Sequence, residues 1–328
     1  MSKTPKHRLR LKALAALLAI AAPLAANAWT NKPVKVIVPA PPGGTMDIVA
    51  RILADSIASE IGQPVIVENK PGAGGAIAVQ ALNAAPADGQ TIMVTASNIL
   101  TEIPLVMKTS FDPIKDVKPV TMVGRANMVL VAAATVPAND VKGLVDYLKK
   151  SKGGKGSFAS YTAGTSSHYA GMILAKKTGL DLQHVPFPGS PPALQQLMGG
   201  QIDIMFDGMA TSLPQIKGGK LKAYAVASKT RSVHLPDVPT TAEAGFAEID
   251  FSNWVGTVVS AKVSPEIVGK INIATVKAAM SPKVRDRLIA AGFEPTVSES
   301  PDKLAAMVKA DYERNAQIVK AFNIQLNQ

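Results

Sequence analysis

The stretch Val34-Lys-Val-Ile-Val-Pro-Ala-Pro-Pro-Gly-Gly-Thr-Met-Asp-Ile-Val-Ala-Arg51 predicts a strand, a rigid turn and a helix, in that order. Residues 34–38 form a short apolar run rich in β-branched side chains, which is typical of a buried strand. Three prolines then restrict the path of the chain, and Gly43 and Gly44 expose backbone N–H groups. Apolar residues recur at helical spacing from there to Ile61, which predicts the helix.

The turn before this helix has the features of an anion site. Unpaired N–H groups at a helix N-terminus and the helix dipole both favour negative charge. The candidate contacts are Pro42, Gly43, Gly44, Thr45 and Met46. A plain turn capped by Thr45 or Asp47 is the alternative, and the Asp47 carboxylate would compete for the same N–H groups.

A second segment repeats this strand, turn and helix. Residues 157–161 predict a strand, 162–167 a turn rich in hydroxyl groups, and the following helix closes at Gly179. The candidate contacts are Tyr161, Thr162, Thr165, Ser166 and His168. An ordinary helix cap by Ser166 or Ser167 is the alternative. Two such sites would suit a ligand with two acidic ends, and the acidic residues that we place near the two loops are Asp47 and Asp207.

The rest of the chain predicts an α/β protein. Strands at 65–68 and 91–95 alternate with helices, which implies a parallel sheet with right-handed crossovers. Ligands of such sheets bind outside the carboxyl ends of the strands, where the 42–47 turn and Ser97-Asn98 would lie. Apolar runs at 120–123 and 128–134 predict a strand pair running between domains. We also predict a strand and turn at 182–190, strands at 202–206, 221–227 and 251–259, helices at 141–151, 191–198, 210–217, 265–280, 282–291 and 301–322, and a short helix within 238–245.

Composition limits the classes of function. The chain has 328 residues, with 35 Lys+Arg, 24 Asp+Glu and no cysteine. Residues 1–28 are predicted to be a secretory signal peptide. They begin with basic residues, continue with an apolar run too short to span a membrane, and end in the small-x-small cleavage pattern Ala26-Asn27-Ala28. Five basic residues lie in that leader, so the rest carries 30 − 24 = +6. This modest excess makes nucleic acid a poor candidate ligand.

Several motifs together resemble one family. Pro41-Pro-Gly-Gly-x-x-Asp-x-x-Ala-Arg51 is similar to the signature of the substrate receptors of tripartite tricarboxylate transporters, the Bug family of periplasmic solute-binding proteins. Further segments resemble the family in the same order along the whole predicted mature chain, among them Gly62-Gln-Pro-Val-Ile-Val-Glu-Asn-Lys-Pro-Gly-Ala-Gly-Gly75, Ala87-Asp-Gly89, Phe111-Asp-Pro113, Gly199-Gly200-Gln-Ile-Asp203 and Leu235-Pro-Asp-Val-Pro-Thr240.

The resemblance implies a two-domain periplasmic-binding-protein fold of type II, with a ligand cleft between domains joined by two crossover strands. One domain would comprise about 29–127 plus 253–328, and the other about 128–252. A receptor of this family is not an enzyme and delivers a carboxylated solute to membrane permease subunits. Its two cleft loops, here 42–47 and 162–168, would hold a carboxylate through N–H groups, hydroxyls and waters. The candidate set is completed by Ser97, Phe187, Asp207 and Asn253.

Departures from the family pattern bear on the ligand. Met46 stands where a small polar residue is common, and Phe187-Pro188 replaces Tyr-Lys, which predicts a more apolar cleft. A core position for Phe187 is the alternative. We predict an aromatic dicarboxylate, with terephthalate as the specific ligand. Since the family also binds aliphatic dicarboxylates, citrate-like acids and acidic amino acids, those remain alternatives, and Asp207 could pair with an ammonium group.

An enzymatic function has less support. A periplasmic serine hydrolase is the alternative, but Gly-x-Ser-x-Gly is absent and Ser166 and His168 are too close in sequence for the usual triad. The histidines lack the spacing of metal ligands, so we predict no metal and no cofactor. The expected partners are a small carboxylate and the permease subunits, and the receptor itself is predicted to be a monomer.

The leader supplies a direct test of localisation. We expect the exported protein to begin at Trp29 and to reside in the periplasm, because signal peptidase cleaves after small-x-small patterns. Intact-mass measurement of the exported protein checks this expectation. A mass that still includes residues 1–28 would contradict it.

Overall fold

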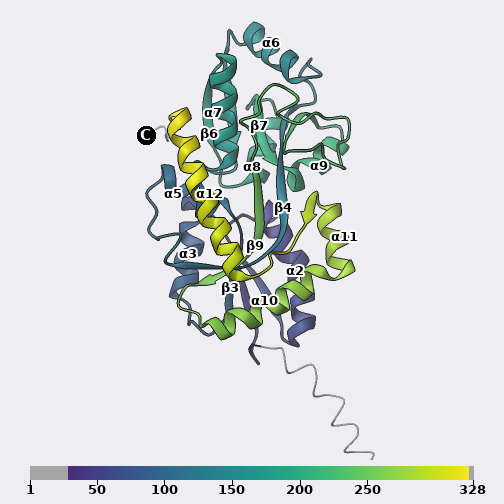
Figure 1. The fold of residues 1–328 in the computed structure, drawn as a ribbon. Coiled ribbons are helices and arrows are strands. Elements are labelled where there is room, and N and C mark those ends of the chain that lie inside the picture. Colours follow the sequence, from purple (N-terminus) through teal and green to yellow (C-terminus); the bar gives the residue numbers. More distant parts are fainter. Residues whose placement is uncertain (1–28, 325–328) are drawn as a thin grey trace, which may run out of the picture.

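Strand β4 (Val117–Ala133) determines the architecture, because this one uninterrupted strand takes part in two sheets. In the computed structural model, which describes residues 29–324, its first part pairs antiparallel with β9 (Ser252–Ser260). Its last part, from Met128 on, pairs antiparallel with β7 (Ile204–Gly208) and β8 (Leu221–Ala227). One domain is built around each part of β4, and the two domains lie end to end (Figure 1).

The first domain has a mixed sheet in the order β2-β1-β3-β9-β4. Its parallel strands are β1 (Val34–Val38), β2 (Val65–Asn69) and β3 (Thr91–Ala96), and the short β10 (Phe293–Pro295) pairs with β4. The helices of this domain are α2 (Thr45–Ile61), α3 (Ala76–Ala84) with the 3₁₀ turn η2 (Ala73–Gly75) before it, α4 (Asn98–Thr101), α5 (Ile103–Val106), α10 (Pro265–Met280) and α11 (Pro282–Ala290).

The second domain repeats this arrangement around the other part of β4. Its parallel strands are β5 (Lys155–Ser160), β6 (Asp181–Pro186) and β7. Its helices are α6 (Val141–Ser151), α7 (Ser166–Thr178), α8 (Ser190–Met198) and α9 (Met209–Lys217). Each sheet has apolar clusters packed against it, and burial of each large side chain in them contributes about 1.5–3 kcal/mol to folding.

The chain crosses between the domains at two adjacent places. β4 crosses near Asn127, which pairs with Ser252 at the start of β9. Phe251 is buried in the core of the second domain, and Trp254 in that of the first. Gly256 permits the tight pairing of the two strands, because a Cβ there would lie 2.1 Å from the carbonyl oxygen of Thr121.

A third element, α12 (Pro301–Phe322), also spans both domains (Figure 1). Leu304 near its start lies in the core of the first domain. Ile318 and Phe322 near its end pack against the core of the second domain. The sequence-based boundary assigned all of 253–328 to the first domain, whereas the structure sets the last turns of α12 against the second.

The element predictions agree with the structure except at a few places. The runs 120–123 and 128–134 form one strand and not a pair, because the intervening residues also pair with β9 and β10. The short helix expected within 238–245 is a set of turns. No helix among residues 29–324 is long and apolar enough to cross a membrane. The predicted signal peptide, 1–28, lies outside the described residues.

Candidate ligand-binding site

A cavity of about 290 Å³ lies between the two domains. It is lined by the loops that follow β1, β2 and β3 in one domain and β5, β6 and β7 in the other, so it faces the carboxyl ends of six parallel strands. Ala126, Asn127 and Met128 on β4 and Asn253 on β9 line it where the chain crosses. Its volume is at the small end of the range for small-molecule sites.

Eight of the fourteen sequence-predicted residues line this cavity. They are Gly44, Thr45, Met46, Tyr161, Thr162, Thr165, Phe187 and Asn253. The other six, Pro42, Gly43, Ser97, Ser166, His168 and Asp207, do not line it. Asn98, which the sequence analysis placed at the carboxyl end of a strand, also lines the cavity, and lining residues that were not candidate contacts include Pro39, Ile99, Ile103, Met107 and Gly189. Their signal was their position after a strand or close to a neighbouring glycine turn.

The start of α2 supplies free donors to the cavity. Asp47 accepts the N–H of Gly43 at 2.9 Å, and Gly44 donates its N–H to the carbonyl of Pro41 at 3.0 Å. Within the described part of the chain the N–H groups of Thr45 and Met46 have no acceptor. The competition expected from Asp47 therefore affects Gly43 and leaves the next turn available.

Asp47 is itself held away from the cavity. Burial alone would raise the pKa of its carboxyl group, but hydrogen bonds from Arg51, Gly43 and Asn69 hold the pKa below its usual value. Arg51 Nε lies 2.9 Å from one carboxylate oxygen, and Asn69 Nδ2 lies 2.9 Å from the other. The charge of Asp47 is thus paired with Arg51, and Asp47 is not among the residues that line the cavity.

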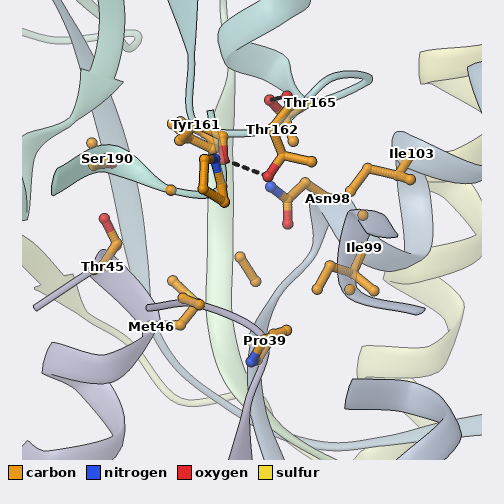
Figure 2. A pocket seen from close by; sticks show the side chains of 18 of the residues that line it. Pro39, Thr45, Met46, Asn98, Ile99, Ile103, Tyr161, Thr162, Thr165 and Ser190 are labelled. Carbon is orange, nitrogen blue, oxygen red and sulfur yellow. Dashed lines mark hydrogen bonds between the residues drawn. The ribbon is translucent and has the colours of Figure 1, made fainter. Parts of the chain in front are cut away.

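The side chains that line the cavity are uncharged. Among its described lining residues there is no Lys, Arg, His, Asp or Glu. Figure 2 shows Thr45 and Met46 on one side of the space and Ile99 and Ile103 on the other. Asn98 is 7% exposed, lies beside the two isoleucines, and its amide has no hydrogen-bond partner within the described part of the chain. The cavity therefore has free backbone donors at the start of α2 and, on the opposite side, two isoleucines together with the unpaired side-chain amide of Asn98.

A chain of polar side chains crosses the domain boundary behind the cavity. Ser97 donates its hydroxyl to Asn253 Oδ1 at 2.7 Å, and Asn253 Nδ2 donates to Ser166 Oγ at 2.7 Å. The hydroxyls of Ser166 and Tyr161 share a hydrogen bond of 3.2 Å. Ser97 and Ser166 do not line the cavity themselves. They are placed to orient Asn253 and Tyr161, which do line it.

The N-terminus of α7 is occupied by Glu102, which the sequence analysis missed. This side chain follows α4 in the first domain, is 2% exposed, and accepts the backbone N–H of Ser166 in the second domain. The statement that Asp47 and Asp207 are the acidic residues near the two loops was therefore wrong. Burial raises the pKa of Glu102 to about 8, against the opposing hydrogen bonds from Ser166.

His168 lies in a buried stack and not in the cavity wall. Its ring is stacked on His184 with centroids 3.9 Å apart, and the ring of Phe158 lies 4.9 Å from that of His184 and 6.1 Å from that of His168. His168 Nδ1 accepts the N–H of Gly164 at 3.3 Å. Burial and the neighbouring His184 lower the pKa of His168 to about 3, and burial lowers that of His184 to about 4. Both rings are therefore neutral at neutral pH.

Asp207 is also enclosed. It accepts hydrogen bonds from the hydroxyls of Ser190, Thr211 and Ser212, and burial raises the pKa of its carboxyl group against their effect. Since it is fully buried and does not line the cavity, it is not placed to pair with an ammonium group of a ligand. Residues 29–324 contain no cluster of three or more His, Cys, Asp or Glu that could hold a metal ion.

We expect Glu102→Gln to stabilise the protein at alkaline pH. The pKa of this group is 4.5 as a free side chain and about 8 in the folded protein, so folding takes up a proton between these values. The contribution of the protonated carboxyl group to the free energy of unfolding is complete below pH 4.5. It is lost as the pH rises from 4.5 to about 8. The amide of the Glu102→Gln variant does not titrate, so this variant does not lose the contribution. Its free energy of unfolding should exceed that of the wild type by about 2–4 kcal/mol at alkaline pH.

Urea unfolding near pH 5 and near pH 8.5 measures this difference. Glu313→Gln is the matched control, because Glu313 is exposed on α12 and undergoes the same change of side chain. The control should differ little from the wild type at either pH. A Glu102→Gln effect of equal size at both pH values would contradict the expectation.

Comparison of the sequence with known proteins identifies the family of this chain. A family model described as tripartite tricarboxylate transporter family receptor matches residues 49–324. Protein BugT of Bordetella pertussis is 32% identical over 309 residues, which cover 94% of each chain.

Two solved structures of similar proteins contain a carboxylate ligand. MatC from Rhodopseudomonas palustris with bound malate is 31% identical, with a TM-score of 0.81 over 88% of this chain and 99% of that one. The R. palustris protein Rpa4515 with adipate is 27% identical, with a TM-score of 0.86 over 90% and 99%. The predicted fold class, a two-domain α/β periplasmic binding protein, is confirmed. The chain therefore belongs to the family of receptors of tripartite tricarboxylate transporters.

Proposed function

We propose that this protein captures a small carboxylate with an apolar body in the cleft between its domains and delivers it to the permease subunits of a tripartite tricarboxylate transporter. The observation that carries the proposal is the cavity itself. It is enclosed between domains, bears no charged side chain, and has the free N–H groups of Thr45 and Met46 at the start of α2. A carboxylate there is held by neutral dipoles and by the Thr45 hydroxyl.

The body of the ligand is proposed to be apolar. Met46 and Phe187 line the cavity, as do Ile99, Ile103 and Met107, and such polarizable and aromatic surfaces suit a ring. These contacts support the aromatic part of the sequence-based ligand, terephthalate. The ligands of the two similar proteins, malate and adipate, support a carboxylate and favour the aliphatic alternative.

A receptor function is favoured over hydrolysis by the surroundings of the serine and histidine. The Ser166 hydroxyl is bonded to Asn253 and Tyr161, and His168 Nδ1 accepts a backbone N–H. No hydrogen bond links Ser166 to His168 in the described chain, so the pair lacks the nucleophile–base contact that acyl transfer needs. A periplasmic location and a monomeric state are part of the same proposal.

The ligand class is tested by thermal-shift measurements on the purified chain. Terephthalate, benzoate, adipate, citrate and glutamate are compared, because they separate ring from chain and one carboxylate from several. A ligand at a hundred times its Kd should add about 2.7 kcal/mol to the stability of the folded state. The ligand must be recovered unchanged, since a hydrolase would consume its substrate. Strong stabilisation by citrate or glutamate with no effect of the aromatic acids would contradict the apolar ligand.

Thr45→Val tests the placement of the carboxylate. Valine keeps the shape and the backbone N–H but removes the hydroxyl of this lining residue, so binding should weaken by about 1–3 kcal/mol. Calorimetric titration of the ligand identified in the screen measures this change. Thr230→Val, at an exposed position outside the cavity, is the matched control and should bind as the wild type does. Equal affinity of the Thr45 variant and the control would refute this placement.

A further inference from the structure

Asn98 is a buried polar side chain of the cavity wall that no group of the described chain satisfies. It is 7% exposed, and its amide has no hydrogen-bond partner within residues 29–324. The other side-chain amides of the described lining are bonded. Asn127 Nδ2 donates to Glu294 Oε1 at 2.6 Å, and both ends of the Asn253 amide take part in the chain of polar side chains behind the cavity. A buried amide without a partner is costly, so the position of Asn98 calls for a ligand atom or a water.

The hydroxyl groups of the lining show a second unpaired side chain. The bonded ones have a partner elsewhere in the protein, and they belong to Tyr161, Thr162, Thr165 and Ser190. The hydroxyl of Thr45, the first residue of α2, has no partner in the described chain. Figure 2 shows Thr45 and Asn98 on opposite sides of the space. The unpaired polar side chains of the described lining therefore lie at two separate places, one in the α2 wall and one in the α4 wall.

The backbone around Asn98 is fixed by the protein itself. Ser97 donates its N–H to the carbonyl of Trp254 at 3.0 Å, and Glu102 donates its N–H to the carbonyl of Asn98 at 3.0 Å. The next residue, Ile99, is buried in the core of the first domain. A side chain on such a support presents its polar atoms in a defined place, which selective recognition requires.

We infer that Asn98 is a specificity-determining residue, whose amide binds a second carboxylate of the ligand on the side of the cavity opposite the start of α2, and so selects diacids over monoacids. The inference rests on the proposed function, which it deepens by adding a polar group at the far end of the apolar body. The lining residues Thr162, Ala163 and Thr165 add backbone N–H groups that have no acceptor in the described chain. Several neutral donors thus offset the lost hydration of the second carboxylate.

A monoacid leaves the amide of Asn98 without a partner. When the apolar end of benzoate or hexanoate covers this side chain, the amide loses its water and gains no hydrogen bond. A site built to bond a polar group rejects an analogue that lacks the group much more strongly than an apolar pocket rejects a missing methylene. The preference for two carboxylates therefore comes from the cost of an unsatisfied amide as well as from the bond that the diacid makes.

The test uses two pairs of acids that differ by one carboxylate, benzoate with terephthalate and hexanoate with adipate. Calorimetry on the full mature chain gives the ratio of the monoacid Kd to the diacid Kd in each pair. In the wild type we expect this ratio to be about ten or more in the pair that binds. Asn98→Leu has nearly the same size and no hydrogen-bonding group, so it should lower the ratio by about tenfold.

Asn98→Asp separates the donor from the size of the side chain. It keeps the shape and one acceptor oxygen but replaces the Nδ2 donor with a carboxylate oxygen, which repels a second carboxylate at neutral pH. The ratio should again fall by about tenfold or more, so this variant decides the question if Asn98→Leu does not fold. Asn139→Leu, at an exposed position outside the cavity, is the matched control and should keep the wild-type ratio within about threefold.

The outcomes are distinct. A wild type that binds the monoacid as tightly as the diacid, or a folded Asn98→Leu or Asn98→Asp variant with an unchanged ratio, would overturn the inference while leaving the carboxylate receptor intact. Failure of all four acids to bind the wild type would overturn the proposed function and the inference with it. A lowered ratio in the Asn98 variants, with the wild-type ratio kept in Asn139→Leu, supports recognition of the second carboxylate by Asn98.

Discussion

The pairing of β4 with strands of both domains is the constraint on which the rest of the structure depends. Most residues of this strand are buried, and buried N–H and C=O groups require partners. β9 and β10 supply them in the first domain, and β7 and β8 in the second. Because Asn127 pairs with Ser252 where both chains cross, the two sheets present the carboxyl ends of their parallel strands to one cavity.

The electrostatics of the cleft follow from how its helix N-termini are satisfied. Glu102 accepts a backbone N–H at the start of α7, and Asp207 accepts hydrogen bonds from hydroxyl groups near the starts of α8 and α9. Asp47 accepts hydrogen bonds from Gly43 and Arg51, and the N–H groups of Thr45 and Met46, two residues that line the cavity, keep no acceptor in the described chain. A binding site made of neutral dipoles avoids the cost of burying a cation when the cleft is closed and without ligand.

Close approach of the domains depends on small residues in the second-domain loops. A Cβ at Gly208 would lie 2.8 Å from Thr45 Oγ1, and one at Gly189 would lie 2.6 Å from the ring of Pro41. The glycines permit this close approach, and the hydrogen bonds of Asn253 and Glu102 together with the packing of α12 hold the two domains against each other. The hydroxyl of Thr45, a residue that lines the cavity, thereby reaches the second domain.

The sequence by itself determined the elements and the family. Periodicity marked β1 and α2, prolines marked the starts of α10, α11 and α12, and the hydroxyl-rich turn marked the start of α7, because these signals lie within a few residues of one another. Only the tertiary structure decided which acceptor satisfies the first N–H group of α7. The contact between Glu102 and Ser166 spans 64 residues and a domain boundary. Whether an N–H group is free depends on an acceptor that a different element brings to it, and no local pattern around Ser166 records that acceptor.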